Sequence, residues 1–310
     1  MAVDSRISAF TAQPSSDPSE DIAAWRVVND QIGQRFGGDL PVGVTVETSQ
    51  FIARDGASVG VRIYRMRSGT PPTNSLQTAV LYFHGGGWVV GSALGSECIA
   101  AQLAHELDAV VISVDYRMAP EYRFPTPIDD CEDALSWVKQ SVVKLSIGAD
   151  AIVLAGDSAG AHLALSLAYR AHDAGNSVQG VMAFYPCIDP SCNSDSMLRL
   201  QAKQPLTRQR MLWFWDQFLG GAKAAGDSTP WLRPNLSGLP PTWIMTASED
   251  PLSSEGQQFA ARLASADVRV GTELHPGMLH GFMRWRTLVP NGGQAVAAAS
   301  QWMRIAAQLP

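Results

Sequence analysis

Short apolar runs alternate with longer segments of mixed polarity along this chain, and the alternation predicts an α/β protein. Eight runs rich in β-branched and aromatic residues are bounded by Gly, Pro or Asp, as strands usually are. They cover approximately residues 46–53, 59–66, 79–83, 110–114, 152–155, 181–185, 242–247 and 268–275. The first two runs flank the turn sequence "RDG", which predicts a β-hairpin.

Segments with apolar residues every three or four positions lie between most of the later runs and predict helices. They cover residues 99–107, 128–143, 159–172, 254–266 and 295–307. Strands that alternate with helices build βαβ units, in which neighbouring strands run parallel and helices cover both faces of the sheet. The sequence therefore predicts one eight-stranded, mostly parallel sheet that opens with a hairpin.

Two segments do not follow this alternation. The first runs from the N-terminus to about residue 40 and has a helical pattern around residues 21–36. The second covers residues 190–234 and contains "LTRQRMLWFWDQFLG". Because both fall outside the predicted sheet, we expect them to be additions to it, such as a lid.

Composition favours a well-buried globular fold over disorder. Of the 310 residues, 46% are apolar and 17% are charged, against about 25% charged in a typical soluble protein. The formal net charge is −6 and no basic block occurs, which argues against nucleic acid or an anionic membrane surface as a partner. No stretch approaches the roughly 20 apolar residues of a transmembrane helix, so no membrane partner is expected.

The N-terminal sequence and the cysteines both favour the cytoplasm. The segment "MAVDSRISAFTAQPSSDPSEDIAAW" lacks an apolar core run and carries acids, which makes it a poor signal peptide. The four cysteines show neither C-x-x-C pairing nor a histidine partner at zinc spacing. We therefore expect reduced, buried thiols, a cytoplasmic protein and no metal site.

The sequence "GDSAG", residues 156–160, places a serine between a predicted strand and a predicted helix. It fits the pattern G-x-S-x-G in the strand–turn–helix context of a nucleophile elbow. That turn is sharp, so small residues must flank the nucleophile, and Gly156 and Gly160 provide the room. The helix start also directs free N–H groups towards the serine. We predict that Ser158 is a catalytic nucleophile.

A serine nucleophile needs a general base, and in one widespread chain order an acid and then a histidine follow the serine. The histidines after Ser158 are His162, His172, His275 and His280. The first two belong to the predicted helix behind the serine. His280 lies in "PGMLHGF", a loop after the last predicted strand, where a base can reach the nucleophile. We favour His280 and keep His275, at the end of that strand, as a second candidate.

The acid that orients the base should follow a strand between the serine and the histidine. "PTWIMTASEDPL" supplies a strand and then Glu249, Asp250 and Pro251. Asp250 opens the next helix, so its alternative role is that of a helix-start carboxylate. We favour Asp250, with Glu249 as a rival and Asp189 as a weaker one.

Acyl transfer also needs N–H donors for the oxyanion, and "LYFHGGGW" ends a strand in three glycines. Glycine lets backbone N–H groups approach a ligand closely. An HGGG-type loop of this kind works together with the N–H of the residue after the nucleophile. The spacing fits neither G-K-[ST] nor G-x-G-x-x-G, which disfavours a phosphate site. The predicted oxyanion hole consists of Gly85, Gly86, Gly87 and Ala159.

Taken together, these motifs resemble the hormone-sensitive-lipase-like group of α/β-hydrolase esterases. The resemblance rests on "HGGGW" (84–88), "DYRMAPEYRFPTPIDD" (115–130), "GDSAG" (156–160), "DPL" (250–252) and "HGF" (280–282), which span about two-thirds of the chain. It implies an α/β-hydrolase fold with a helical cap. The cap would comprise residues 1–45 and 190–234, and the catalytic core residues 46–189 and 235–310.

The resemblance implies the same triad of Ser158, Asp250 and His280, and it assigns Gly85 a part in shaping the oxyanion loop. The chain departs from the family pattern D-P-L-x-D-E-G at Ser254, where a second acid is common. This departure puts a supporting contact in doubt and leaves the triad intact. We interpret a further set of polar residues as structural groups that hold the loops around the site. They are His84, Asp115, Arg117, Glu121 and Asp157.

The implied activity is that of a serine carboxylesterase acting on short- to medium-chain acyl esters through an acyl-enzyme, without a cofactor. An apolar wall of the substrate pocket is expected from Trp88 beside the oxyanion loop and from Trp213, Phe214 and Trp215 in the insertion, although aromatic residues at helical spacing more often belong to a core. Relatives often dimerise through the sheet edge, so a homodimer is compatible with the chain.

Two rival functions remain. Plant gibberellin receptors resemble this family but have lost the base histidine, and the presence of His280 tells against a receptor. A peptidase on the same fold usually carries a second large domain, for which 310 residues leave no room.

Overall fold

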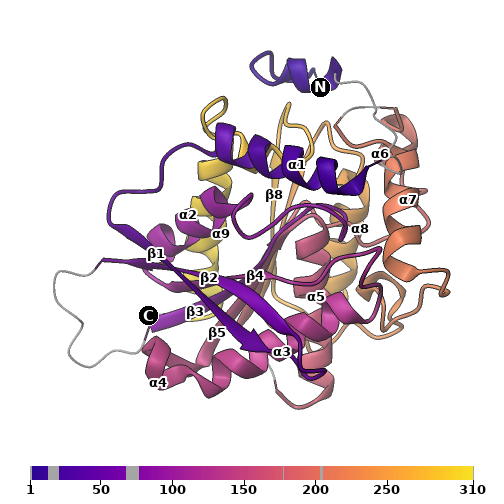
Figure 1. Ribbon diagram of the computed structural model, residues 1–310. Coiled ribbons are helices and arrows are strands. Elements are labelled where there is room, and N and C mark those ends of the chain that lie inside the picture. The colour runs from indigo at the N-terminus through magenta and orange to yellow at the C-terminus, as the bar shows by residue number, and fades with distance from the viewer. Residues whose placement is uncertain (1, 13–20, 68–76, 177, 203–204, 310) are drawn as a thin grey trace.

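The computed structural model describes residues 2–12, 21–67, 77–176, 178–202 and 205–309, and one eight-stranded sheet forms its centre (Figure 1). Each predicted apolar run corresponds to one strand. The strands are β1 (Val44–Ile52), β2 (Ser58–Met66), β3 (Gln77–Phe83), β4 (Val110–Asp115), β5 (Ile147–Asp157), β6 (Gly180–Phe184), β7 (Thr242–Ala247) and β8 (Val270–His275).

The strand order in space is β1-β2-β4-β3-β5-β6-β7-β8. β2 runs antiparallel to both β1 and β4, and the remaining neighbours are parallel. The predicted mostly parallel sheet that opens with a hairpin is therefore confirmed. Because parallel strands end at one edge of a sheet, the loops after β3, β5, β7 and β8 come together there.

Side chains alternate between the two faces of the sheet and build one apolar core on each. Along β3, Ala79, Leu81 and Phe83 pack into the first core, whereas Val80 and Tyr82 pack into the second. Helices cover both faces, as expected for central strands that are apolar on both sides. The first core is covered by α3 (Thr126–Gln140), α5 (Ala159–Asp173) and α8 (Ser253–Ala264), and the second by α2 (Glu97–Leu107) and α9 (Asn291–Ala306).

Further helices lie outside this layered core. The N-terminal part contributes η1 (Ser8–Ala12) and α1 (Ile22–Gly37), and residues 190–234 contribute α6 (Asp195–Arg199), α7 (Arg208–Leu219) and η2 (Pro230–Leu232). Two short elements, α4 (Val142–Leu145) and η3 (Phe282–Arg284), complete the set within the described ranges. In Figure 1, α1 crosses the upper part of the molecule and α7 flanks it on the right.

Helices α1 and α7 meet although they are far apart in the sequence. The rings of Trp25 in α1 and Phe214 in α7 stack with their centroids 5.4 Å apart and an interplanar angle of 18°. Asp21 starts α1 by accepting a hydrogen bond from the N–H of Ala24, and Thr207 starts α7 by accepting one from Arg210. The two non-sheet segments of the sequence are therefore in contact with each other through these rings.

No helix in the described ranges has both the length and the apolar character that crossing a membrane requires.

Candidate active site

Ser158 lies in a strained turn between β5 and α5. Its φ is 55° and its ψ is −118°, a conformation that residues other than glycine rarely adopt. A Cβ at Gly156 would lie 2.3 Å from the carbonyl group of Gly160, and a Cβ at Gly160 would lie 1.9 Å from the carbonyl oxygen of Phe83. Both positions therefore require glycine, and the turn has the geometry of a nucleophile elbow.

The side chains of Ser158, His280 and Asp250 form one hydrogen-bonded series. His280 Nε2 lies 2.9 Å from Ser158 Oγ, and His280 Nδ1 lies 2.7 Å from Asp250 Oδ2. The Asp250 side chain is fully buried, whereas that of His280 is 13% exposed, so the series leads from the interior to the pocket. The structure thus brings together three residues that the sequence places in three separate loops.

The surroundings of His280 fix the orientation of its ring. Asp250 Oδ1 accepts a hydrogen bond from the N–H of Leu252 at 2.9 Å, which leaves Oδ2 to face the ring. Tyr185 packs edge-on against the imidazole, with the ring centroids 5.0 Å apart. Because Nδ1 faces a carboxylate, it carries the proton, and Nε2 is left as the acceptor that faces Ser158.

The competing histidines lie elsewhere. His275 closes β8, with its Nε2 3.1 Å from Glu273 Oε2. His162 is fully buried, with Nε2 2.8 Å from the Ser228 carbonyl oxygen, and burial lowers its pKa to about 3. A histidine with that pKa stays neutral at physiological pH and serves packing. His172 lies against Gly238, at the far end of α5.

The competing carboxylates also make other contacts. Asp189 Oδ1 accepts a hydrogen bond from the N–H of Ser191 at 2.9 Å, and its Oδ2 accepts one from the hydroxyl of the same residue at 2.8 Å. Glu249 is buried, and its N–H donates to the carbonyl oxygen of Met278. Glu249 Oε1 accepts a hydrogen bond from the Ser248 hydroxyl at 3.4 Å, and it is Asp250 that faces the His280 ring.

The glycine loop after β3 offers N–H groups next to the serine. Gly86 and Gly87 have φ values of 125° and 60°, and a Cβ on Gly87 would lie 2.3 Å from the ring of Phe214. Their N–H groups donate to no acceptor within the described residues, and neither does that of Ala159, the first residue of α5. These three groups are therefore available for an oxyanion.

Gly85 differs from the other two glycines because its N–H is already engaged. It donates to Asp157 Oδ1 at 2.8 Å, and the same oxygen accepts the Tyr82 hydroxyl at 2.6 Å. Gly85 thus shapes the loop and leaves donation to its neighbours. On the other side of the loop, the hydroxyl of Tyr116 donates to the carbonyl oxygen of His84 at 2.8 Å.

The other residues that we interpreted as structural make contacts of the same kind. Asp115 accepts the N–H of Ala93 at 2.7 Å, Arg117 pairs with Asp130, and Glu121 pairs with Arg26. At the departure from the family pattern, two serines bond reciprocally. The Ser254 N–H donates to Ser196 Oγ at 2.8 Å, and the Ser196 N–H donates to Ser254 Oγ at 3.1 Å. These bonds join α8 to α6, so hydroxyl groups provide the supporting contact.

A pocket of about 140 Å³ opens onto Ser158 and His280. Phe214 lines it, as expected. Trp88, Trp213 and Trp215 are not among its described lining residues, so the geometry does not support a pocket wall made from them. The Trp88 ring points into the core instead of the pocket. It is fully buried there, and its Nε1 donates a hydrogen bond to His162 Nδ1 at 3.2 Å. Trp213 is partly buried and packs at the edge of that core.

Sequence reasoning missed most of the pocket wall because it comes from segments that carry no motif. The missed side chains belong to η1, α1, α7 and the region around η3. They are Phe10, Trp25, Asn29, Ile32, Leu206, Arg210, Met211, Arg284 and Trp285.

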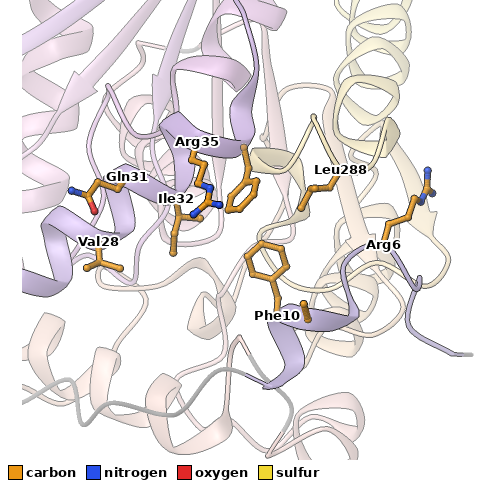
Figure 2. A pocket seen from close by; sticks show the side chains of 9 residues that line it. Arg6, Phe10, Val28, Gln31, Ile32, Arg35 and Leu288 are labelled. Carbon is orange, nitrogen blue, oxygen red and sulfur yellow. The ribbon is translucent and has the colours of Figure 1, made fainter.

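A second, outer pocket of about 590 Å³ adjoins the catalytic one (Figure 2). Phe10 and Ile32 line both pockets, and Figure 2 shows their side chains extending from η1 and α1 into the space between these two elements. Phe10 stacks on Trp285 with ring centroids 4.0 Å apart and an interplanar angle of 8°. The Phe10 side chain therefore forms a wall between the two spaces.

Comparisons with known proteins agree with this geometry. Residues 80–284 match a family described as having the alpha/beta hydrolase fold. An ethyl acetate hydrolase from Pseudomonas putida is 33% identical over 249 residues, which cover 78% of this chain and 77% of that protein. The carboxylesterase NlhH of Mycobacterium tuberculosis is 33% identical over 222 residues, covering 70% of each protein.

Solved structures extend the similarity to nearly the whole chain. A hyperthermophilic esterase from the archaeon Pyrobaculum calidifontis superposes with a TM-score of 0.89 at 30% identity, covering 98% of this chain and 99% of that one. A thermostable esterase from Pseudomonas putida has a TM-score of 0.90 at 26% identity, with 100% and 99% coverage. The chain belongs to this α/β-hydrolase family, of the hormone-sensitive-lipase-like type, and the predicted fold class is confirmed.

Proposed function

We propose that this chain is a serine carboxylesterase that hydrolyses short- to medium-chain acyl esters, with Ser158 as nucleophile, His280 as base and Asp250 as the acid that orients it. That it is a carboxylic ester hydrolase follows from its family and its esterase relatives. The observation that supports these roles best is the unbroken hydrogen-bonded series from Ser158 to Asp250.

In the proposed reaction, His280 Nε2 accepts the hydroxyl proton of Ser158 while Oγ attacks the ester carbonyl carbon. Asp250 holds the protonated imidazole through Nδ1. The N–H groups of Gly86, Gly87 and Ala159 stabilise the oxyanion of the tetrahedral intermediate, and each such donor is typically worth about 3–4 kcal/mol of barrier.

Collapse of the intermediate breaks the bond to the alcohol oxygen, which receives the proton from His280 Nε2. Water then enters, gives a proton to the same nitrogen and attacks the acyl-enzyme. A second collapse releases the carboxylic acid and returns the proton to Ser158 Oγ.

The size of the catalytic pocket supports small substrates. Its volume of about 140 Å³ is below the roughly 300–1,000 Å³ of most small-molecule sites. Short acyl groups fit such a space, and longer chains need an outlet past Phe10.

Three further features belong to the proposal. Residues 1–45 and 190–234 act as a cap over the core, a role supported by the contact of Trp25 with Phe214. The protein works in the cytoplasm, which its four free, buried cysteines favour. It forms a homodimer through the edge of the sheet, as related esterases often do.

The test measures hydrolysis of p-nitrophenyl esters from acetate to decanoate by the wild type and by Ser158→Ala. We expect the wild type to prefer butanoate or hexanoate and the variant to lose roughly 10⁴-fold or more in kcat. Ser166→Ala is the matched control, because Ser166 is a buried serine of α5, the helix that begins directly after Ser158. A steady rise in rate up to decanoate would contradict the proposed substrate range, and an active Ser158→Ala would contradict the proposed nucleophile.

A further inference from the structure

The wall of the catalytic pocket contains two arginines. Arg210 comes from the first turn of α7, and Arg284 comes from η3, just after His280. Both line the pocket that contains Ser158 Oγ, and both are only partly accessible to solvent. The rest of the wall is mainly apolar and aromatic. Two cations in such a wall are unusual, because removing a charged group from water costs free energy unless an opposite charge compensates it.

Neither arginine has an acidic partner among the described residues. Arg210 Nη1 donates to the carbonyl oxygen of Pro205 at 2.7 Å, and its guanidinium lies over the ring of Trp25, 5.4 Å from the centroid. Arg284 Nη1 donates to the side-chain oxygen of Asn29 at 2.7 Å. All three partners are neutral. Burial without a compensating charge lowers the pKa of Arg210.

Some other arginines of the fold do have acidic partners. Arg117, for example, pairs with Asp130 at 2.7 Å and with Asp55 at 2.6 Å, although it is also largely buried. The pocket itself holds one carboxylate among its described lining residues, that of Asp157. Its Oδ1 is occupied by Tyr82 and Gly85. Neither arginine forms an ion pair with Asp157 among the described residues, and the two guanidinium groups outnumber this carboxylate in the pocket wall.

We propose that the natural ester carries an anionic group, most simply a carboxylate, which Arg210 and Arg284 bind while Ser158 attacks the ester. This inference rests on the proposed esterase function and specifies its substrate class. A guanidinium presents a planar set of N–H donors that matches a carboxylate, and each arginine retains donors beyond the one already used. The apolar remainder of the wall accommodates the carbon chain between the two ends.

The positive charge at the pockets is opposite in sign to the net charge of the whole protein. The formal net charge is −6, so the protein as a whole repels anions. At the neighbouring outer pocket, Arg35 lies over the ring of Phe36, 5.1 Å from its centroid (Figure 2). Positive charge thus continues from the catalytic pocket to the outer one, against the sign of the protein as a whole.

The carboxylate can belong to the acyl part or to the alcohol part of the ester. Two pairs of substrates distinguish these two positions. Monoethyl glutarate is compared with its terminal amide, and 3-(butanoyloxy)propanoate with its amide. Each pair has the same shape and ester but differs in charge. A pocket without a cation would favour the amide, because it would have to desolvate the acid. We expect the wild type to favour the acid in at least one pair, by about tenfold or more in kcat/KM.

The variants Arg210→Gln and Arg284→Gln test which side chains are responsible. Each is expected to lower the acid-to-amide ratio by about tenfold, mainly through KM for the acid. Arg65→Gln is the matched control, because it removes the same charge from β2, away from the pocket, and should leave the ratio unchanged. Added salt should lower the wild-type ratio, since the pocket is open to solvent.

The acid-to-amide ratio of kcat/KM also distinguishes a substrate-binding role of the two arginines from a purely structural one. Equal loss of acid and amide turnover in both variants would show a structural role only and overturn the inference. A wild-type ratio of one or below in both pairs would overturn it without any variant, while turnover of the amides would leave the esterase proposal standing. If the wild type hydrolysed neither of the two amide-bearing esters nor p-nitrophenyl butanoate, the proposed esterase function would be overturned and, with it, the inference.

Discussion

Asp157 precedes the proposed nucleophile, yet its contacts predict a role in the oxyanion loop. Its Oδ1 accepts both the Tyr82 hydroxyl at 2.6 Å and the Gly85 N–H at 2.8 Å, in a place where the residue is 3% exposed. Asp157→Ala removes this one acceptor and leaves two buried donors, the Tyr82 hydroxyl and the Gly85 N–H, unpaired. Each unpaired donor costs about 1–3 kcal/mol, or about 2–6 kcal/mol for the pair.

That cost is relieved when the loop moves away from its present position. A displaced loop no longer aims the Gly86 and Gly87 N–H groups at the oxyanion, and losing one such donor lowers kcat by about 10²–10³-fold. We therefore expect Asp157→Ala to lower kcat for p-nitrophenyl butanoate by that factor, with a smaller change in KM. Asp157→Asn keeps one oxygen acceptor and should lose only about tenfold, because charge-assisted bonds are roughly twice as strong as neutral ones.

Asp189→Ala is the matched control for this experiment. Asp189 is also buried and also accepts one backbone N–H and one hydroxyl, but both donors belong to Ser191 and not to the glycine loop. Kinetics at 25 °C and thermal unfolding are measured for the whole set. We expect Asp189→Ala to lower Tm while kcat stays near the wild-type value. A folded Asp157→Ala with unchanged kcat would refute the reasoning.

Three other variants give separate tests. Phe10→Ala removes the wall shared by the two pockets, so kcat/KM for decanoate should rise relative to butanoate; an unchanged acyl-length profile would count against a wall. Burial raises the pKa of Glu255 above its unfolded value of 4.5, so its contribution to stability is complete below pH 4.5 and is lost as pH rises towards the folded pKa. Glu255→Gln avoids that loss, so its free energy of unfolding relative to the wild type should increase as pH rises above 4.5, by at most about 1.4 kcal/mol per pH unit; a difference that stays constant with pH would contradict the pKa shift. Asp250→Asn keeps the size of the buried side chain but favours the wrong imidazole tautomer, and kcat should fall by about 10⁴-fold; near-normal turnover would exclude Asp250 as the acid.

The eight strands, the opening hairpin and the mostly parallel character of the sheet could be predicted because their signal is local, whereas the spatial order of the strands was not predicted. Central strands such as β3 are apolar on both faces, and the turn at residues 53–57 carries Gly56 with φ 85°, as the hairpin interpretation requires. The predicted ends of the helices were less accurate than the predicted existence of the elements. The helix expected over 128–143 ends at Gln140, and a separate short helix, Val142–Leu145, follows.

The C-terminal helix shows why some helix boundaries could not be predicted from the apolar pattern. It was expected to begin at residue 295, but α9 begins at Asn291 and includes Gly292 and Gly293. Glycines disfavour helices in isolation and hide the apolar period. Gly292 is tolerated because it packs against the backbone of Met283, where a Cβ would lie 2.8 Å from the carbonyl oxygen. This tertiary contact leaves no trace in a local pattern.

The residues proposed for the triad could be singled out because each follows a strand in a recognisable motif. The pocket wall could not, because Phe10, Arg210 and Arg284 reach it from separate segments whose packing decides their direction. Trp88 illustrates the same limit. It adjoins the glycine loop in sequence, but its φ of 61° and its bond to His162 turn the ring into the core.

Covalent trapping tests the central claim most directly. The wild type and Ser158→Ala are treated with an alkyl fluorophosphonate, digested and analysed by mass spectrometry. The account predicts one phosphonylated residue, Ser158, with loss of esterase activity in proportion to labelling, and no labelling of the variant. Labelling of a different residue, or an active wild type that is never labelled at Ser158, would contradict it.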